Sequence, residues 1–356
     1  MRTPSRALAV LSLPLRAPTS RPFTLFPRPT RTTLRTPLRA PPLRTMSSAA
    51  SPLKQPVKLA CVQLASGADK SANLARARTK VLEAARLGAR IIVLPEIFNS
   101  PYGTDFFPRY AEQLLPSPPS AETSPSFHAL SSMAADAGVY LVGGSIPELE
   151  VDPATDKKLY YNTSLTFGPA GELLATHRKT HLFDIDIPGK ITFRESDVLS
   201  PGNKVTIVDL PEYGRILVGI CYDVRFPEPA TIAAREGCFA LIYPGAFNLT
   251  TGPLHWKLLA QGRALDNQMY VAMCSPARDM DGPYHAYGHS MILDPLAQVV
   301  AETEEKEDIV VWELDGARIA EVRRNIPLTT QRRFDVYPDV SKGDVRFEEP
   351  GAPGKK

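Results

Sequence analysis

Three residues of complementary chemistry each follow a short apolar run of the chain. Glu96 comes directly after the run Ile91–Leu94 and a proline, Lys179 follows the second arm of an expected hairpin, and Cys221 follows Arg215–Ile220. A thiol that attacks a carbonyl carbon needs a base to manage its proton and a donor for the oxyanion that forms. A carboxylate, an ammonium and a thiol can together supply these functions.

Each residue alone also has an ordinary structural explanation. A cysteine inside an apolar run is by default an inert core residue, the glutamate could cap a helix, and the lysine could be one of several surface bases. The dense polar stretch 222–228 after a core strand favours a site at Cys221. Because Cys221 would lie between a strand and a helix, we expect main-chain N–H groups and the helix N-terminus to favour its thiolate.

Three segments resemble the signatures of the nitrilase, or carbon–nitrogen hydrolase, superfamily in order and spacing. They are Leu94-Pro95-Glu96, the segment 177–182 (HRKTHL) and the segment 219–228 (GICYDVRFPE). The similarity covers about residues 56–340. Three segments in the right order are far more specific than any one of them.

The resemblance implies a role for each matching position. Cys221 would be the nucleophile, Glu96 the general base, and Lys179 the cation that holds both and then donates to the oxyanion with the main-chain N–H of Tyr222. Glu195 matches a second acid that the family places beside these three residues. The resemblance implies no cofactor and no metal ion.

Within the superfamily the chain looks like the omega-amidase branch. The finer match lies in the segments 98–103, 182–193, 243–253 and 275–279. It implies hydrolysis of the terminal amide of 2-oxoglutaramate or 2-oxosuccinamate to the dicarboxylate and ammonia, through a cysteine thioester. The distal carboxylate of such a substrate needs a cation or several donors. The candidates for binding it are Tyr102, Tyr222, Arg225, Phe247, Asn248, Thr250 and Arg278. Arg225 could equally tie the turn that follows the nucleophile.

Other reactions are partly excluded. A serine hydrolase needs a G-x-S-x-G elbow, and the nearest segment, Gly288-His289-Ser290-Met291, lacks the second glycine. A nitrilase, or an amidase acting on a deaminated peptide related to glutathione, would share the same three residues, so both stay open. A catalytically silent scaffold is disfavoured because the set is complete.

The surrounding sequence alternates short apolar runs with helical patterns, which predicts an α/β domain. Gly168–Gly171 separates two strand-like runs and indicates a hairpin. The resemblance implies a four-layer α-β-β-α sandwich with two central mixed sheets flanked by helices. We expect strands at 57–64, 91–94, 139–145, 161–167, 172–177, 215–220, 239–243, 270–275, 290–293 and 309–314, and helices near 74–87, 126–137, 227–236, 254–267 and 316–325.

The first 45 residues differ from the rest in composition. They hold nine of the 41 basic residues, all arginine, and no acid, among many prolines, serines and threonines. This composition is typical of an organellar transit peptide, so we expect delivery to the mitochondrial matrix. A start at Met46 would give an untargeted cytosolic form. We therefore divide the chain into a targeting segment (1–45), a hydrolase domain (56–340) and a polar C-terminal tail (341–356).

Composition limits the partners. Without the first 45 residues the chain has 32 basic and 38 acidic residues, and this mild acidity gives no electrostatic footprint for nucleic acid. No run approaches the 18 or so apolar residues of a membrane span. The four cysteines show neither C-x-x-C spacing nor a neighbouring histidine cluster, which argues against a zinc site. We expect a small amide as substrate, and the resemblance implies a homodimer.

Overall fold

The computed structural model describes residues 51–152 and 154–348. The chain divides into two units, Met1–Ser48 and Ala49–Lys356, and the described residues all lie in the second. The predicted targeting segment and Met46 lie outside the described residues, as does the end of the predicted tail. Within the described ranges, no helix is long and apolar enough to cross a membrane.

Two sheets form the centre of the second unit. The first has seven strands in the order β15-β1-β2-β3-β5-β4, with β6 also paired to β5. Its members are β1 (Val57–Gln63), β2 (Ile91–Val93), β3 (Tyr140–Val142), β4 (Ile146–Val151), β5 (Lys158–Phe167), β6 (Leu173–Arg178) and β15 (Asp308–Leu314). Strands β1, β2 and β3 run parallel and the other pairs run antiparallel, so the sheet is mixed.

The second sheet has six strands in the order β14-β13-β12-β11-β10-β9. They are β9 (Thr206–Leu210), β10 (Gly214–Val218), β11 (Cys238–Pro244), β12 (Tyr270–Cys274), β13 (Met291–Leu293) and β14 (Val299–Glu302). A separate two-stranded sheet pairs β7 (Asp184–Ile187) with β8 (Ile191–Arg194).

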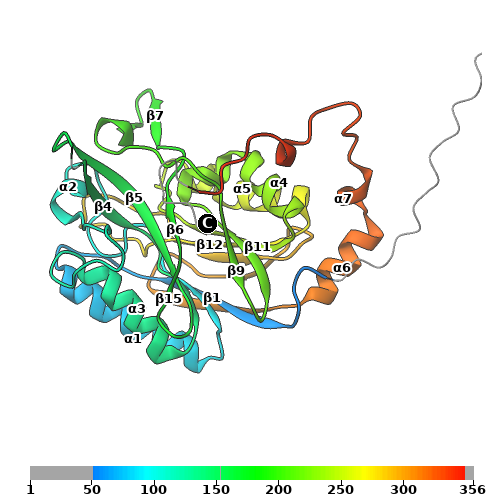
Figure 1. Ribbon diagram of the computed structural model, residues 1–356, viewed down its shortest axis with the longest axis horizontal. Helices are drawn as coiled ribbons and strands as arrows, with labels where there is room; N and C mark the ends of the chain where they lie inside the picture. Colours follow the sequence, from blue (N-terminus) through cyan, green and yellow to red (C-terminus); the bar gives the residue numbers. More distant parts are fainter. Residues whose placement is uncertain (1–50, 153, 349–356) are drawn as a thin grey trace, which may run out of the picture. The chain divides into compact units, whose positions relative to one another are not determined.

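Alternation along the strands produces the layers. In β1, Leu59 and Cys61 belong to a core cluster shared with the second sheet, whereas Ala60 and Val62 pack with helices on the opposite face. Those helices are α1 (Lys70–Arg86) and α3 (Pro125–Ala137), and α4 (Pro227–Arg235) and α5 (Gly252–Asn267) cover the second sheet in the same way (Figure 1). The predicted layered α/β fold is confirmed, because the two sheets share a core between them and each carries helices on its outer face.

Sequence patterns missed several strands. The missed strands β4, β9 and β14 each end the strand path of a sheet, where half-exposed and polar residues interrupt the apolar run. The hairpin β7–β8 was also missed because every residue in it is exposed or half-buried. These strands lack the continuous burial that makes a central strand recognisable in sequence.

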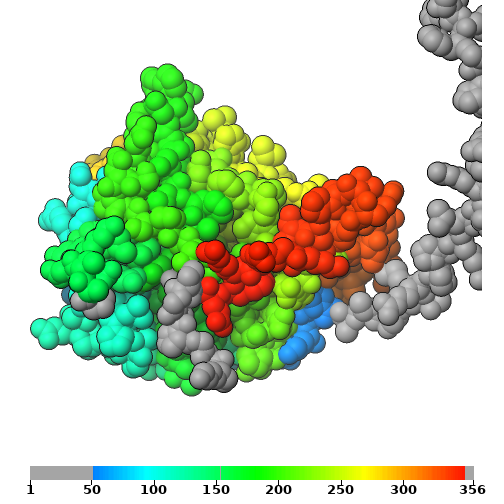
Figure 2. Space-filling view, turned by 45° about the horizontal axis from the view of Figure 1, so that its top comes forward, coloured from blue at the N-terminus to red at the C-terminus, as the bar shows by residue number. Residues whose placement is uncertain are grey.

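The C-terminal part of the described chain packs back on the second sheet. It comprises α6 (Gly316–Asn325), α7 (Leu328–Gln331) and the 3₁₀ turn η3 (Val340–Lys342). Asp339 accepts a bond from Arg235 of α4 at 3.4 Å, and the N–H of Val205, just before β9, donates to the carbonyl of Arg346 at 2.7 Å. In Figure 2 this segment, in red, lies across the surface formed by the green part of the chain.

Candidate active site

Glu96 lies in a tight turn just beyond β2. Ile97, the next residue, has a φ of 51°, and its N–H donates to the hydroxyl of Ser145 at 3.1 Å. Gly144, with a φ of 59°, lies directly against the carbonyl of Pro95, where a Cβ atom would clash. The segment after β3 therefore fixes the turn that carries Glu96, and only glycine fits at that contact.

Lys179 follows the last residue of β6. Its N–H donates to the carbonyl of Asn162 in β5 at 2.8 Å, and its carbonyl accepts from the N–H of Gly202 at 2.8 Å. Arg178 beside it donates to the carboxylate of Glu148 at 2.9 and 2.5 Å. The predicted hairpin is thus the element that places this lysine.

Cys221 begins the 3₁₀ turn η2 (Cys221–Arg225) after β10. Its φ of 48° is in the left-handed region, which costs a residue with a side chain about 1–3 kcal/mol. Such strain persists only where the surrounding structure holds it, and it is concentrated at functional sites. Helix α4 begins only at Pro227, so the helix N-terminus expected beside the thiol is several residues away.

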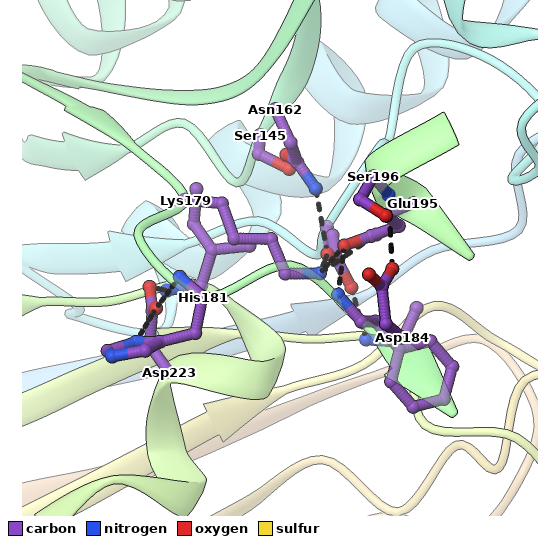
Figure 3. A network of polar contacts seen from close by, with 12 residues as sticks. Ser145, Asn162, Lys179, His181, Asp184, Glu195, Ser196 and Asp223 are labelled. Carbon is purple, nitrogen blue, oxygen red and sulfur yellow. Dashed lines mark hydrogen bonds and ion pairs between the residues drawn. The ribbon is translucent and has the colours of Figure 1, made fainter. Parts of the chain in front are cut away.

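The structure brings the charged side chains of the predicted site together. The Lys179 ammonium donates to Glu96 Oε1 at 2.9 Å and lies 2.9 Å from both oxygens of Glu195 (Figure 3). The Cys221 thiol lies beside the Glu96 carboxylate and the main chain of Ala246, close enough for both to influence its pKa. All four side chains are buried.

Each carboxylate has further donors that fix its orientation. Glu96 accepts from Asn162 Nδ2 and from the N–H of Ala246, both at 2.8 Å. Glu195, at the start of the 3₁₀ turn η1 (Glu195–Asp197), accepts from the Tyr102 hydroxyl and from the N–H of Phe183, both at 2.7 Å. Charges buried this fully are stable only with such partners.

Burial and like charge set the protonation of the site. Burial raises the pKa of Glu96 above 4.5, Lys179 opposes the rise, and Glu195 adds to it. Burial acts to lower the pKa of Lys179, but the carboxylates of Glu195 and Glu96 outweigh burial and hold that pKa well above 10.5. The resting site therefore has a protonated lysine between two acids.

The expectation of a favoured thiolate is wrong for this resting site. Burial and the neighbouring Glu96 carboxylate raise the pKa of the Cys221 thiol well above 9.0, and Lys179 only partly opposes them. One ammonium already serves two carboxylates, so a thiolate would add a second uncompensated negative charge. The proton must leave the thiol as it attacks, and the Glu96 carboxylate is in place to accept it.

The predicted substrate-binding residues differ in the contacts that they make. Tyr102 contacts Glu195, and Tyr222 packs its ring between Phe183 and Phe226. Arg225 stacks over the rings of Tyr222 and Phe247, at 5.2 and 4.9 Å from the ring centroids. Its Nη1 meets His255 Nδ1 at 3.2 Å, and within the described chain no carboxylate pairs with it.

Three further candidates have mainly structural contacts. Asn248 Oδ1 accepts from the N–H groups of Thr250 and Thr251 and so fixes the turn before α5, while Asn248 Nδ2 is buried without a partner in the described residues. Thr250 is half-buried beside it. Arg278 donates to the carbonyls of Ala286 and Tyr287 and therefore supports its own loop.

Sequence reasoning missed Tyr284. Its hydroxyl donates to the carbonyl of Ala246 at 2.5 Å, and its ring lies 4.4 Å from that of Tyr102. With Glu96, the two tyrosines line a cavity of about 270 Å³. A tyrosine in a polar loop gives no signal in a single sequence.

Asp223 was also missed as an individual residue, although it lies in the polar stretch that drew attention to Cys221. Its carboxylate accepts from the side chains of His177 and His181, which flank Lys179. Burial acts to raise its pKa, but these two hydrogen bonds outweigh burial and hold the pKa well below 3.8.

No group of three or more His, Cys, Asp or Glu side chains in the described residues could hold a metal ion. Cys61, Cys238 and Cys274 are buried and free, in line with the packing role expected for them.

The chain is similar to known proteins over most of its length. The Carbon-nitrogen hydrolase family model matches residues 58–324. "Omega-amidase NIT3" of Saccharomyces cerevisiae is 54% identical over 297 residues, which are 83% of this chain and 99% of that protein. "Omega-amidase NIT2" of Mus musculus is 50% identical over 285 residues, 80% of this chain and 98% of the mouse protein. The fold is also similar to the crystal structure of Saccharomyces cerevisiae Nit3, described as a member of branch 10 of the nitrilase superfamily. The TM-score is 0.72 at 50% sequence identity, and the match covers 80% of this chain and all of the Nit3 chain.

Proposed function

The chain belongs to the carbon–nitrogen hydrolase family, and we propose that it is an omega-amidase that hydrolyses the terminal amide of 2-oxoglutaramate or 2-oxosuccinamate. The observation that carries the chemistry is the buried contact of Lys179 with Glu96 and Glu195 beside the Cys221 thiol. The identity to relatives named omega-amidase supports the choice of amide.

In the first half-reaction, Cys221 Sγ attacks the amide carbon while its proton passes to Glu96. Lys179 and the main-chain N–H of Tyr222 donate to the oxyanion of the tetrahedral intermediate. Glu96 then gives the proton to the amide nitrogen, the C–N bond breaks, and ammonia leaves. A thioester between Cys221 and the acyl group remains.

In the second half-reaction, a water molecule attacks the thioester carbon and gives a proton to Glu96. The C–S bond breaks, the acid is released, and Cys221 regains its proton. Glu195 holds Lys179 through both steps and is itself fixed by Tyr102. Each residue returns to its starting protonation, so the cycle needs no cofactor.

Arg225 is the best candidate to bind the distal carboxylate of the substrate. Burial lowers the pKa of its guanidinium, its Nε is buried without a partner in the described residues, and its stacking between two rings fixes its direction. A substrate carboxylate would supply the missing anion. Tyr102, Phe247, Asn248 and Thr250 would form the remaining walls.

The test is ammonia release from 2-oxoglutaramate compared with glutamine, asparagine, deaminated glutathione and an aliphatic nitrile. We expect 2-oxoglutaramate to have the highest kcat/KM. An Arg225→Met variant should raise KM for 2-oxoglutaramate far more than KM for an uncharged short amide. A preference for deaminated glutathione or for the nitrile would reject the substrate assignment while leaving the catalytic residues in place.

We further propose a homodimer formed through α5. The exposed leucines Leu254, Leu258 and Leu265 recur on one face of this helix, with exposed fractions of 57, 64 and 51%. A second copy of the chain would cover such an apolar stripe. Light scattering should give twice the monomer mass, and Leu258→Glu should halve it; a wild-type monomer would reject the dimer.

For localisation, we propose mitochondrial delivery by residues 1–45 and a cytosolic form that starts at Met46. Fractionation of cells that express a C-terminally tagged chain should give both forms. Met46→Leu should remove only the cytosolic one. A single full-length cytosolic species would contradict both parts of the proposal.

A further inference from the structure

One carboxylate connects the segment that carries Lys179 to the turn that carries Cys221. Asp223 Oδ1 accepts from the N–H of His181 at 2.9 Å and from His181 Nδ1 at 2.8 Å. Asp223 Oδ2 accepts from the N–H of Ile220 at 2.9 Å and from His177 Nε2 at 3.0 Å. Each carboxylate oxygen therefore accepts two hydrogen bonds. Oδ1 accepts both from His181, which follows Lys179, whereas Oδ2 accepts one from His177, which precedes Lys179, and one from the turn that carries Cys221, called the nucleophile turn below.

The spacing along the chain makes this connection specific. His177 and His181 lie two residues before and two residues after Lys179, and Asp223 lies two residues after Cys221. Figure 3 shows His181 and Asp223 on one side of Lys179, with Glu195 and Asn162 toward the end of its side chain. Neither histidine contacts the reacting atoms.

Each histidine is also held by a second contact. His177 Nδ1 meets the hydroxyl of Thr206, the first residue of β9, at 2.9 Å. The His181 ring stacks on Phe226 with a centroid distance of 3.7 Å and an interplanar angle of 11°. The carboxylate thus joins the first sheet, through the end of β6 and the residues after it, to the second sheet, through the residues after β10.

We propose that Asp223 is a positioning residue that sets the Lys179 ammonium relative to the Cys221 thiol. The two side chains come from different sheets, and Cys221 keeps a left-handed φ of 48° that the turn must hold. The bond from the N–H of Ile220 to Asp223 closes that turn across the strained residue. A misplacement of about 1 Å between reacting groups costs roughly 100-fold in rate.

The test compares Asp223→Asn with Glu148→Gln. Glu148 is equally buried and holds Arg178, the neighbour of Lys179, but has no contact with the nucleophile turn. Three readouts are needed: the melting temperature, kcat and KM for 2-oxoglutaramate, and the rate of Cys221 alkylation by iodoacetamide. The other cysteines are buried in the core, and Cys221→Ala supplies the alkylation blank.

Both variants should melt at lower temperature. Asp223→Asn should also lower kcat about 30- to 100-fold, with KM within threefold, and slow alkylation of Cys221 about tenfold. The reason is that the amide group of the new Asn side chain points a donor at N–H groups, which releases the Lys179 ammonium from its place beside the thiol. Glu148→Gln should leave alkylation within twofold. If Asp223→Asn changes only stability, as Glu148→Gln does, the proposal is wrong.

A second variant covers the case in which Asp223→Asn does not fold. His181→Phe keeps the stacked ring on Phe226 and removes only the ring donor to Asp223. It should lower kcat about fivefold at unchanged KM and slow alkylation to a similar extent, and unchanged values would overturn the proposal. The proposal builds on the proposed amidase reaction, but alkylation needs no substrate. Failure of wild-type turnover would therefore reject the amidase assignment alone.

Discussion

The two sheets bring their catalytic residues to the site by different means. The first sheet delivers Glu96 and Lys179 among other buried charges, including the pair Glu148 and Arg178. The second sheet delivers Cys221 from strands that are almost wholly apolar, since every residue of β11 and β12 is buried and the side chains are nearly all apolar. Ion pairs orient the residues on one side, while on the other side close packing and the strained turn closed by Asp223 orient the thiol.

This difference separates stability from chemistry. A buried carboxylate or ammonium that loses its partner destabilises the fold as well as the reaction, because its charge is left uncompensated. A thiol in an apolar layer has no such dependence. Substitutions in the two regions should therefore give different combinations of activity and stability.

The largest contrast is expected between Lys179→Ala and Cys221→Ala. Lys179→Ala removes an oxyanion donor and leaves Glu96 and Glu195 buried together without a cation. We expect kcat to fall at least about 1000-fold and the free energy of unfolding to fall by roughly 3–5 kcal/mol. Cys221→Ala should abolish turnover while changing the free energy of unfolding by less than about 1 kcal/mol.

Urea unfolding with a steady-state ammonia assay measures both quantities. Wild-type turnover by Cys221→Ala would remove the nucleophile assignment. Equal stability of the two variants would mean that the lysine is not needed to balance the buried acids, and the contrast between the sheets would fail.

The next contrast concerns packing. Leu241→Ala in β11 removes a fully buried side chain and should lower the free energy of unfolding by about 2–5 kcal/mol. Leu241 shares an apolar cluster with Cys221 but makes no polar contact with the catalytic residues, so the folded fraction should keep kcat within about threefold. Leu141→Ala in β3 is the matched substitution in the first sheet. A tenfold loss of kcat in folded Leu241→Ala protein would show that the apolar sheet tunes the thiol as well as supporting it.

Much of the fold could be predicted from sequence because continuous burial leaves a clear pattern. The central strands, the hairpin before Lys179 and the five long helices fall where the apolar runs indicated. The edge strands β4, β9 and β14 did not, since their half-exposed residues follow no such period. Ordered signature segments also predicted that Glu96, Lys179 and Glu195 would meet.

The partners of these residues were beyond sequence reasoning. Tyr284 reaches the site from a polar loop, and Asp223 acts through contacts that join residues more than 40 positions apart. The protonation of Cys221 was predicted in the wrong direction, because it depends on how many buried charges surround the thiol. Such quantities are set by three-dimensional proximity and not by local pattern.

The loss of activity at low pH tests the role of the buried charges that the first sheet brings to the site. Glu96 accepts a proton only when ionised, and its pKa is raised above 4.5, so kcat/KM should fall as pH drops through a midpoint above 4.5. Glu195 contributes to that rise through its charge. Glu195→Gln should therefore move the midpoint to lower pH while also lowering the rate. If the midpoint stays in place in Glu195→Gln, with controls for the effect of the buffer, Glu96 is not the group that titrates.

The smallest expected effect concerns the contact between the two sides. Tyr284→Phe keeps the ring packed against Tyr102 but removes the hydrogen bond to the carbonyl of Ala246, whose N–H holds Glu96. We expect a loss of about 0.5–1.5 kcal/mol in the free energy of unfolding. Because this peptide contacts both the acid and the thiol, kcat should fall as well, by about three- to tenfold.

Tyr270→Phe is the matched control, since its hydroxyl also bonds the main chain, at Asp315, but far from Glu96. It should lose similar stability with unchanged kcat; equal effects on kcat would mean that the hydroxyl of Tyr284 stabilises the loop without orienting the site.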